Sequence, residues 1–251
     1  MLKRILSLIA LLAVVGGVHA ADNADKTVRA AIHSLLPLVV IDKVVKSDLP
    51  GFYEVVISGQ IVYVTADGKY LLQGNLYDVP AKKDLTQARI AAIREQAVKA
   101  LPASKQLIFA AKNPKHTVTV FTDLDCPYCR AFNKNLVAFN KAGISVDYVM
   151  FPLDIHPGAQ KAWVAVWCSD DRKAAFNEAM NGKDPGTATC ANPVAETKAL
   201  GLSLGISATP TVLAEDGTSV DLTKAQSPQS LMAELDRLAE SKIKSDKLAG
   251  R

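Results

Sequence analysis

The sequence predicts an α+β N-terminal domain built from a helix and an antiparallel sheet, then a helical linker and a larger α/β domain with a helical insertion. Three observations predict this order. Short strand patterns separated by glycine turns come first, a long run of helix-forming residues follows, and strand and helix patterns then alternate. We expect the first domain over residues 21–82, the linker helix over 83–103 and the α/β domain over 104–251.

Residues 1–20 have the pattern of a secretory signal peptide. Lys3 and Arg4 give a positive start, residues 5–15 are almost entirely apolar, and small residues precede Ala20. The apolar run is short of the about 20 residues that a membrane-spanning helix needs. We therefore expect cleavage after about Ala20 and export of the chain. No later segment approaches a spanning length, so the mature chain is predicted to be soluble, with no membrane span.

The charge of the mature chain argues against a nucleic-acid partner. Removal of Lys3 and Arg4 with the signal lowers the formal net charge from +4 to a value near +2. That excess is small, and no stripe of Lys and Arg interleaved with aromatic residues accompanies it. Nucleic-acid binding is therefore not expected.

The first domain is predicted to be a helix followed by an antiparallel meander. Asp67-Gly68 is a strong hairpin signal between two of its strands. The expected elements are a helix over 24–36 and strands over 39–46, 52–57, 61–65 and 70–73. A unit of this size has only a small core. It would gain stability by burying one face against a second copy of itself.

The linker is predicted to be a helix over 85–101. Asp84 is placed to cap it, Gln87 stands three residues later, and Pro102 ends it. An ordinary surface helix is the alternative interpretation. The change of composition on both sides favours a connecting arm between two domains.

From residue 117 the pattern is that of an α/β domain. The expected elements are strands over 117–122 and 144–151, a helix over 128–140, a largely helical insertion over 156–204, a hairpin over 210–214 and 219–222, and a last helix from the cap Ser227 to about Lys242. Strand, helix, strand, insertion, hairpin and closing helix together indicate one compact domain.

Cys126 and Cys129 lie between the first strand and the first helix of this domain. Unpaired N–H groups and the helix dipole favour a thiolate at Cys126, which is the attacking species in disulfide exchange. Two intervening residues, Pro127 and Tyr128, let the second thiol reach the first sulfur. Pro127 suits the first helical turn because its missing N–H is not needed there. The acidic Asp123 and Asp125 oppose the thiolate, while Arg130 supports it.

The cysteine pair has two other interpretations. A zinc site needs four ligands, and this motif offers two, with Cys168, Cys190 and the histidines scattered elsewhere. A purely structural short-loop disulfide is the other alternative. The strand before the motif and the amphipathic helix after it favour a thioredoxin-like arrangement. From the residues alone, all three pairings of the four cysteines remain possible.

Thr209-Pro210 is a second candidate element of the site. The ordinary interpretation is a loop proline that enters an edge strand, with a trans peptide bond. The functional interpretation is a cis-proline that faces the cysteine pair. The Thr209 backbone would then be free to pair with the extended chain of a substrate.

These motifs resemble the bacterial periplasmic disulfide isomerase family that includes DsbC and DsbG. The resemblance covers nearly the whole mature chain. It is carried by residues 118–123, Cys126-Pro127-Tyr128-Cys129, Trp167-Cys168, Cys190 and 205–210, and in the first domain by residues 63–69 and 73–79.

The resemblance implies a V-shaped homodimer that pairs through the N-terminal domains, each with a thioredoxin-like catalytic domain. It implies that Cys126 is the nucleophile and Cys129 the resolving thiol, without cofactor or metal. Cys168 and Cys190 match a structural disulfide of DsbC that typical DsbG sequences lack. Two departures stand out: DsbC commonly has glycine where Pro127 stands, and residues 221–228 lack the expected glycine- and tyrosine-rich stretch.

The implied function is that of a periplasmic protein disulfide isomerase or reductase, which rearranges wrong disulfides in exported proteins. Its implied partners are misoxidised clients and a membrane thiol reductant of the DsbD type. The alternatives are a DsbG-like or net oxidase activity and a chaperone that holds unfolded chains.

Overall fold

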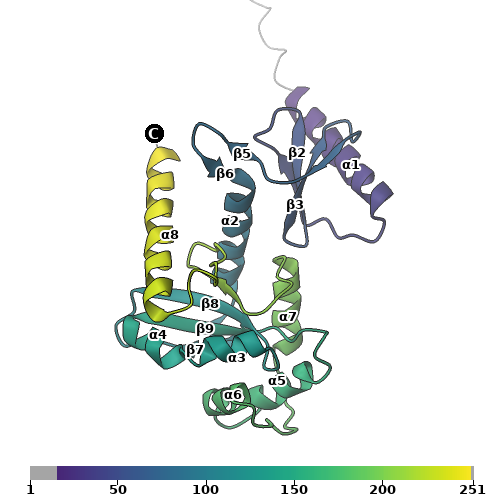
Figure 1. Ribbon diagram of the computed structural model, residues 1–251. Coiled ribbons are helices and arrows are strands. Elements are labelled where there is room, and N and C mark those ends of the chain that lie inside the picture. The colour runs from purple at the N-terminus through teal and green to yellow at the C-terminus, as the bar shows by residue number, and fades with distance from the viewer. Residues whose placement is uncertain (1–15, 250–251) are drawn as a thin grey trace, which may run out of the picture. The chain divides into compact units, whose positions relative to one another are not determined.

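The computed structural model describes residues 16–249, with side chains described from Asn23 to Lys244 (Figure 1). The predicted signal peptide falls largely on residues 1–15, which lie outside the described residues. The chain divides into two compact units near Gly74. The first contains helix α1 (Gly16–Leu35) and a sheet in the order β1 (Lys43–Lys46), β2 (Phe52–Ile57), β3 (Gln60–Thr65), β4 (Leu71–Gln73).

The first unit is the predicted helix and antiparallel meander. Val28 and Ile32 of α1 are buried in one cluster with Val55 and Val64 of the sheet. Helix α1 includes residues before the predicted Ala24, since it already covers Gly16, the first described residue. Strand β1 is shorter than predicted, since only Lys43–Lys46 pair with β2.

The second unit has a four-stranded sheet in the order β10 (Thr211–Leu213), β8 (His116–Thr122), β9 (Ile144–Met150), β7 (Leu107–Phe109). β8 and β9 are parallel, and the two outer strands run antiparallel to them. Its helices are α2 (Leu85–Ala100), α3 (Pro127–Asn133), α4 (Leu136–Ala142), α5 (Ala159–Trp167), α6 (Arg172–Met180), α7 (Val194–Ser203) and α8 (Pro228–Ala249). A 3-10 turn, η1 (Ala103–Lys105), follows α2, and a small ribbon of β5 (Tyr77–Asp78) and β6 (Lys83–Asp84) precedes it.

Helices cover both faces of this sheet (Figure 1). On one face, Val118 and Val120 of β8 belong to the large cluster that contains residues of α3 to α6 and α8. On the other face, Phe121 packs in a cluster with residues of α2 and α7. Side chains alternate across a strand, so consecutive residues of β8 and β9 serve two separate cores.

A helix is present where the linker helix is predicted, as α2, and its cap is as expected. The Asp84 carboxylate accepts a hydrogen bond of 2.9 Å from the N–H of Gln87. Ile93, Ala97 and Val98 pack against the second cluster. The turn at Gly217 approaches α2 so closely that an added Cβ would lie 2.0 Å from the Ala91 carbonyl oxygen. Within the second unit, α2 is therefore fixed to the sheet rather than free of it.

Three predictions about this unit were wrong in detail. The single helix over 128–140 is two helices, because the N–H of Asn135 bonds back three residues to Phe132 and the chain turns there. The strand over 219–222 is reduced to one bridge between Leu213 and Ser219. The Asp221 side chain accepts the Thr223 N–H and turns the chain away. β7 was not predicted, since three residues are too few to show alternation.

The last helix begins as predicted at the cap Ser227. The Ser227 hydroxyl accepts the N–H of Ser230 at 3.1 Å, and the Ser230 hydroxyl accepts the N–H of Ser227 at 2.9 Å. This reciprocal pair stabilises the helix start. The helix extends beyond the predicted Lys242 to Ala249. Over the described part of the chain, none of the helices combines the length and the apolar character that crossing a bilayer requires.

Candidate active site

The cysteine pair lies where β8 ends and α3 begins. β8 ends at Thr122, the chain turns through Asp123 to Asp125, and Cys126 is the N-cap residue of α3. Pro127 takes the first helical position, where its fixed φ and missing N–H are tolerated. Tyr128 is 76% exposed, whereas both cysteines are buried. The dipeptide between the thiols therefore presents one aromatic side chain to the solvent.

The loop at Thr209-Pro210 faces the first cysteine. Its peptide bond is cis. The Cys126 thiol donates a hydrogen bond of 3.2 Å to the carbonyl oxygen of Thr209, which is 83 residues away in the sequence. The structure thus brings together the two motifs that the sequence separates, and it does so through the backbone of the residue before the proline.

The second cysteine is held in a different way. The backbone N–H of Asp123 donates to the Cys129 sulfur at 3.4 Å. Burial raises the pKa of the Cys129 thiol to about 12, against the opposing effect of the Asp123 N–H and the Thr122 and Thr209 hydroxyls. Cys129 is therefore a protonated thiol at neutral pH.

This raised pKa predicts selective alkylation. When the folded dithiol protein is treated with iodoacetamide at pH 8, we expect Cys126 to be modified and Cys129 to remain unmodified, because only a thiolate reacts. In a Cys126→Ala variant, alkylation of Cys129 should rise about tenfold per pH unit toward its pKa. Peptide mass spectrometry measures both. Equal labelling of the two thiols in the folded protein, with urea-unfolded protein as the control, would contradict the prediction.

The acidic residues beside the motif are each paired. The Asp123 carboxylate is fully buried and accepts the N–H groups of Asp125 at 2.7 Å and of Leu153 at 2.6 Å. His156 Nδ1 lies 3.1 Å from the same carboxylate. Arg130 donates to the Leu124 carbonyl at 2.7 Å and lies 3.3 Å from Asp125. These pairings hold the turn between β8 and α3 in place.

The other two cysteines form a disulfide. Cys168 and Cys190 are joined at an S–S distance of 2.06 Å. Cys168 ends α5, and Cys190 lies in the segment before α7. The bond closes the part of the insertion that contains α6, and Cys126 and Cys129 remain free thiols.

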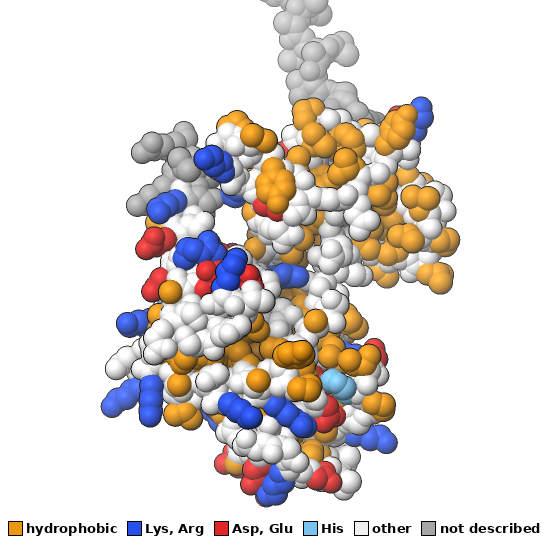
Figure 2. Space-filling view, viewed as in Figure 1, with side chains coloured by type: hydrophobic (Ala, Val, Ile, Leu, Met, Phe, Trp, Pro, Cys, Tyr) orange, Lys and Arg blue, Asp and Glu red, His pale blue; other side chains and the backbone are white. Residues whose placement is uncertain are grey.

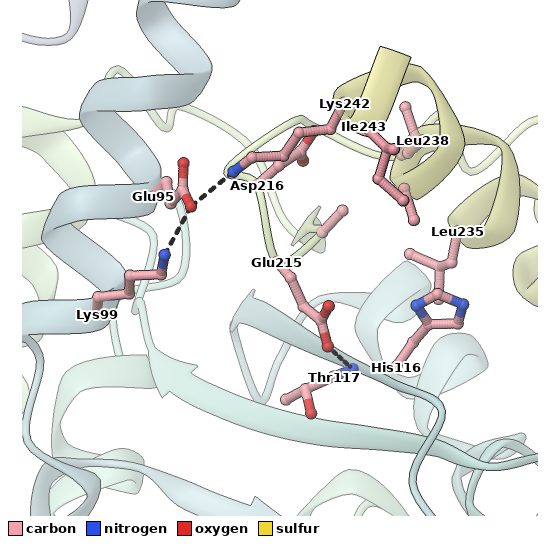
Figure 3. Close-up of a pocket in the computed structure, with 12 residues that line it drawn as sticks. Glu95, Lys99, His116, Thr117, Glu215, Asp216, Leu235, Leu238, Lys242 and Ile243 are labelled. Carbon is pink, nitrogen blue, oxygen red and sulfur yellow. Dashed lines mark hydrogen bonds and ion pairs between the residues drawn. The ribbon is translucent and has the colours of Figure 1, made fainter. Parts of the chain in front are cut away.

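A hollow elsewhere in this unit holds no candidate chemistry (Figure 3). It lies at the start of β8, whereas the cysteines follow the end of that strand. The carboxylates of its two glutamates already have partners: Glu95 accepts from Lys99 and Lys242, both at 2.7 Å, and Glu215 accepts the N–H of Thr117 at 2.9 Å. Among the described residues, no group of three or more His, Cys, Asp or Glu side chains is placed to hold a metal ion.

Neither Thr122 nor His156 is a predicted site residue. Thr122 is expected as the end of a strand and as part of residues 118–123 that carry the resemblance. His156 is expected at the start of a helical region and as one of the scattered histidines that do not complete a zinc site. Alternation along β8 puts Thr122 on the same face as Val118 and Val120, which is the face that the cysteines share. The alternation of residues along this strand could therefore have identified Thr122 from the sequence. Nothing local indicates that His156 approaches Asp123.

Comparisons with known proteins agree with this arrangement. Residues 18–87 match the family model described as the disulfide bond isomerase protein N-terminal domain, and residues 103–239 match the thioredoxin-like domain. The thiol:disulfide interchange protein DsbC of Dickeya dadantii is 33% identical over 245 residues, which cover 94% of this chain and 96% of that protein.

Two further relatives extend the comparison. DsbC of Escherichia coli K12 is 33% identical over 224 residues, covering 87% of this chain and 90% of that protein. A crystal structure of a disulfide interchange protein from Neisseria gonorrhoeae shares 34% identity, with a TM-score of 0.42, and the match covers 45% of this chain and 81% of that one.

Proposed function

Because the chain belongs to the DsbC family of thiol:disulfide interchange proteins, we propose that it rearranges wrong disulfides in exported proteins with Cys126 and Cys129. One observation carries this proposal: a free thiol at the start of α3 that bonds to the backbone of Thr209, beside Pro210. A carbonyl at that place can instead accept a hydrogen bond from the extended chain of a client. Client and nucleophile would then meet at the same point.

The proposed reaction begins with the Cys126 thiolate. It attacks one sulfur of a client disulfide, forms a mixed disulfide and releases the other client sulfur as a thiolate. A client thiolate can then attack a client sulfur, displace Cys126 and leave the client rearranged. Alternatively, Cys129 attacks Cys126, and the client leaves with both of its thiols reduced. Cys126 is the proposed nucleophile and Cys129 the proposed resolving thiol.

The proposed partners follow from this chemistry. Isomerisation requires the dithiol form, so a reductant must return the pair to that form after each net reduction. We propose a membrane thiol reductant of the DsbD type, misoxidised client proteins as substrates, and the periplasm as the compartment, with the signal removed after about Ala20.

The first unit supports a homodimer. β4 is an outer strand of its sheet, and Leu71 and Leu72 on it are 41% and 45% exposed. Figure 2 shows hydrophobic side chains spread over the surface of this unit. An exposed apolar edge strand is a ready site for pairing with another chain. We propose that residues 21–82 dimerise there, that 83–103 form the linker and that 104–251 form the catalytic domain. Sedimentation that finds only monomers would contradict the dimer.

Refolding of scrambled ribonuclease tests the function. The reduced protein, supplied without other thiols, is expected to restore ribonuclease activity, because it can open wrong disulfides. A net oxidase would instead act on reduced ribonuclease and would be found mostly as the disulfide when thiols are trapped in cells. An inert reduced protein would contradict the proposal, and so would a pair found mostly oxidised in cells.

A further inference from the structure

One backbone N–H donates to the sulfur of Cys129, and two threonine hydroxyls lie near it. The N–H of Asp123 lies 3.4 Å from it. The hydroxyls of Thr122 and Thr209 act on the same sulfur, since each favours its ionised form. Thr122 comes from the end of β8 and Thr209 from the loop before β10. Two segments far apart in the chain therefore direct polar groups at one thiol.

In the dithiol form the Thr122 hydroxyl lies close enough to the Cys129 sulfur to lower the pKa of that thiol, but it makes no hydrogen bond of ordinary geometry. Thr122 is 0% exposed, and within residues 16–249 its Oγ1 has no hydrogen-bond partner, as is also true of Oγ1 of Thr209. A buried polar group without a partner is unfavourable and calls for an explanation. A neutral thiol sulfur is a weak acceptor, whereas a thiolate is a strong one. The unused donors therefore fit a state in which Cys129 carries a negative charge.

We propose that Thr122 is a positioning residue for the resolving step, in which its hydroxyl donates to the Cys129 thiolate and so sets how often a client leaves reduced rather than rearranged. This inference rests on the proposed function. Donors fixed in advance around a developing charge stabilise it without reorganisation. Burial alone would keep Cys129 protonated, so the donors are needed most when this sulfur must become the attacking group.

The step balances within the pair. In the mixed disulfide, the Cys129 thiolate attacks the sulfur of Cys126. The Cys126–Cys129 bond forms, and the bond between Cys126 and the client sulfur breaks. The client sulfur leaves as a thiolate and takes up the proton that Cys129 released. The two electrons that reduce the client disulfide come from the enzyme dithiol, and no other reactant is needed.

The test separates this step from the first attack. In excess 5,5′-dithiobis(2-nitrobenzoate), Cys126 releases one coloured thiolate as it forms a mixed disulfide, and Cys129 releases the second as it resolves that disulfide. For Thr122→Val, which keeps the shape but removes the hydroxyl, we expect the second phase to slow about tenfold and the first to stay within about twofold. Thr122→Ser, which keeps the hydroxyl, should restore the second phase to within about twofold of wild type.

Thr119→Val is the matched control. Thr119 is a buried threonine of the same strand, but alternation puts it on the opposite face from Thr122. Its replacement should leave both phases unchanged. If Thr122→Val does not fold, Thr122→Ala takes its place, because Ala and Ser at this position differ only in the hydroxyl.

The outcomes are distinguishable. A second phase at the wild-type rate in Thr122→Val, or equally slow in Thr122→Ser, overturns the role of the hydroxyl. A wild-type protein that shows no first phase overturns the proposed function itself.

Discussion

Cys126→Ala should reduce the refolding of scrambled ribonuclease to the uncatalysed rate. The variant has no sulfur at the start of α3 to form the mixed disulfide, and the remaining Cys129 is buried, with its pKa raised to about 12 by that burial. At neutral pH Cys129 is too rarely ionised to take over. The measurement is the recovery of ribonuclease activity with time, at equal concentrations of wild type and variant.

Cys129→Ala is the matched control, because it removes the other thiol and keeps the nucleophile. It should retain part of the isomerase activity, since a client thiolate can release Cys126, and it should accumulate mixed disulfides with clients. Capture of clients by Cys129→Ala but not by Cys126→Ala would assign the two roles. Rescue of scrambled ribonuclease by Cys126→Ala at the wild-type rate would refute the assignment.

Removal of the Cys168–Cys190 disulfide should have the largest effect on the free energy of unfolding. Cys168 and Cys190 are separated by 22 residues in the sequence. A bond that closes a loop of this length restricts the unfolded chain and stabilises the folded state by about 3 kcal/mol in the chain-entropy model. The Cys168→Ala/Cys190→Ala variant is therefore expected to lose about that much unfolding free energy, measured by urea denaturation.

Two comparisons complete this experiment. Wild-type protein whose four cysteines are all reduced should unfold near the urea midpoint of the double variant. At temperatures where the double variant is folded, its first reaction phase with 5,5′-dithiobis(2-nitrobenzoate) should match that of wild type, because Cys126 is intact. An unchanged midpoint would contradict a stabilising role, and loss of the first phase would indicate that this disulfide takes part in the reaction.

Local signals predicted much of the fold. Asp84 caps α2 and Ser227 caps α8 as expected, since a cap is formed between residues three apart. The errors arose where contacts between distant segments decide the structure and the local sequence pattern does not. The break at Asn135 lets α3 and α4 both pack onto the sheet, with the rings of Phe132 and Phe139 4.9 Å apart. β7 exists because β9 offers an edge to Leu107–Phe109, not because these three residues show a strand pattern.

The residues that can exchange disulfides were evident from the amino-acid sequence: two cysteines spaced by Pro127 and Tyr128, after a strand and at the start of a helix. How the surroundings of the two sulfurs differ depends on the folded chain. Cys126 bonds to the Thr209 carbonyl, while Cys129 is buried beside the Asp123 N–H and the Thr122 hydroxyl. The physical reason is that a thiol's ionisation depends on burial and on donors brought from distant segments, and neither can be read from residues adjacent in the chain.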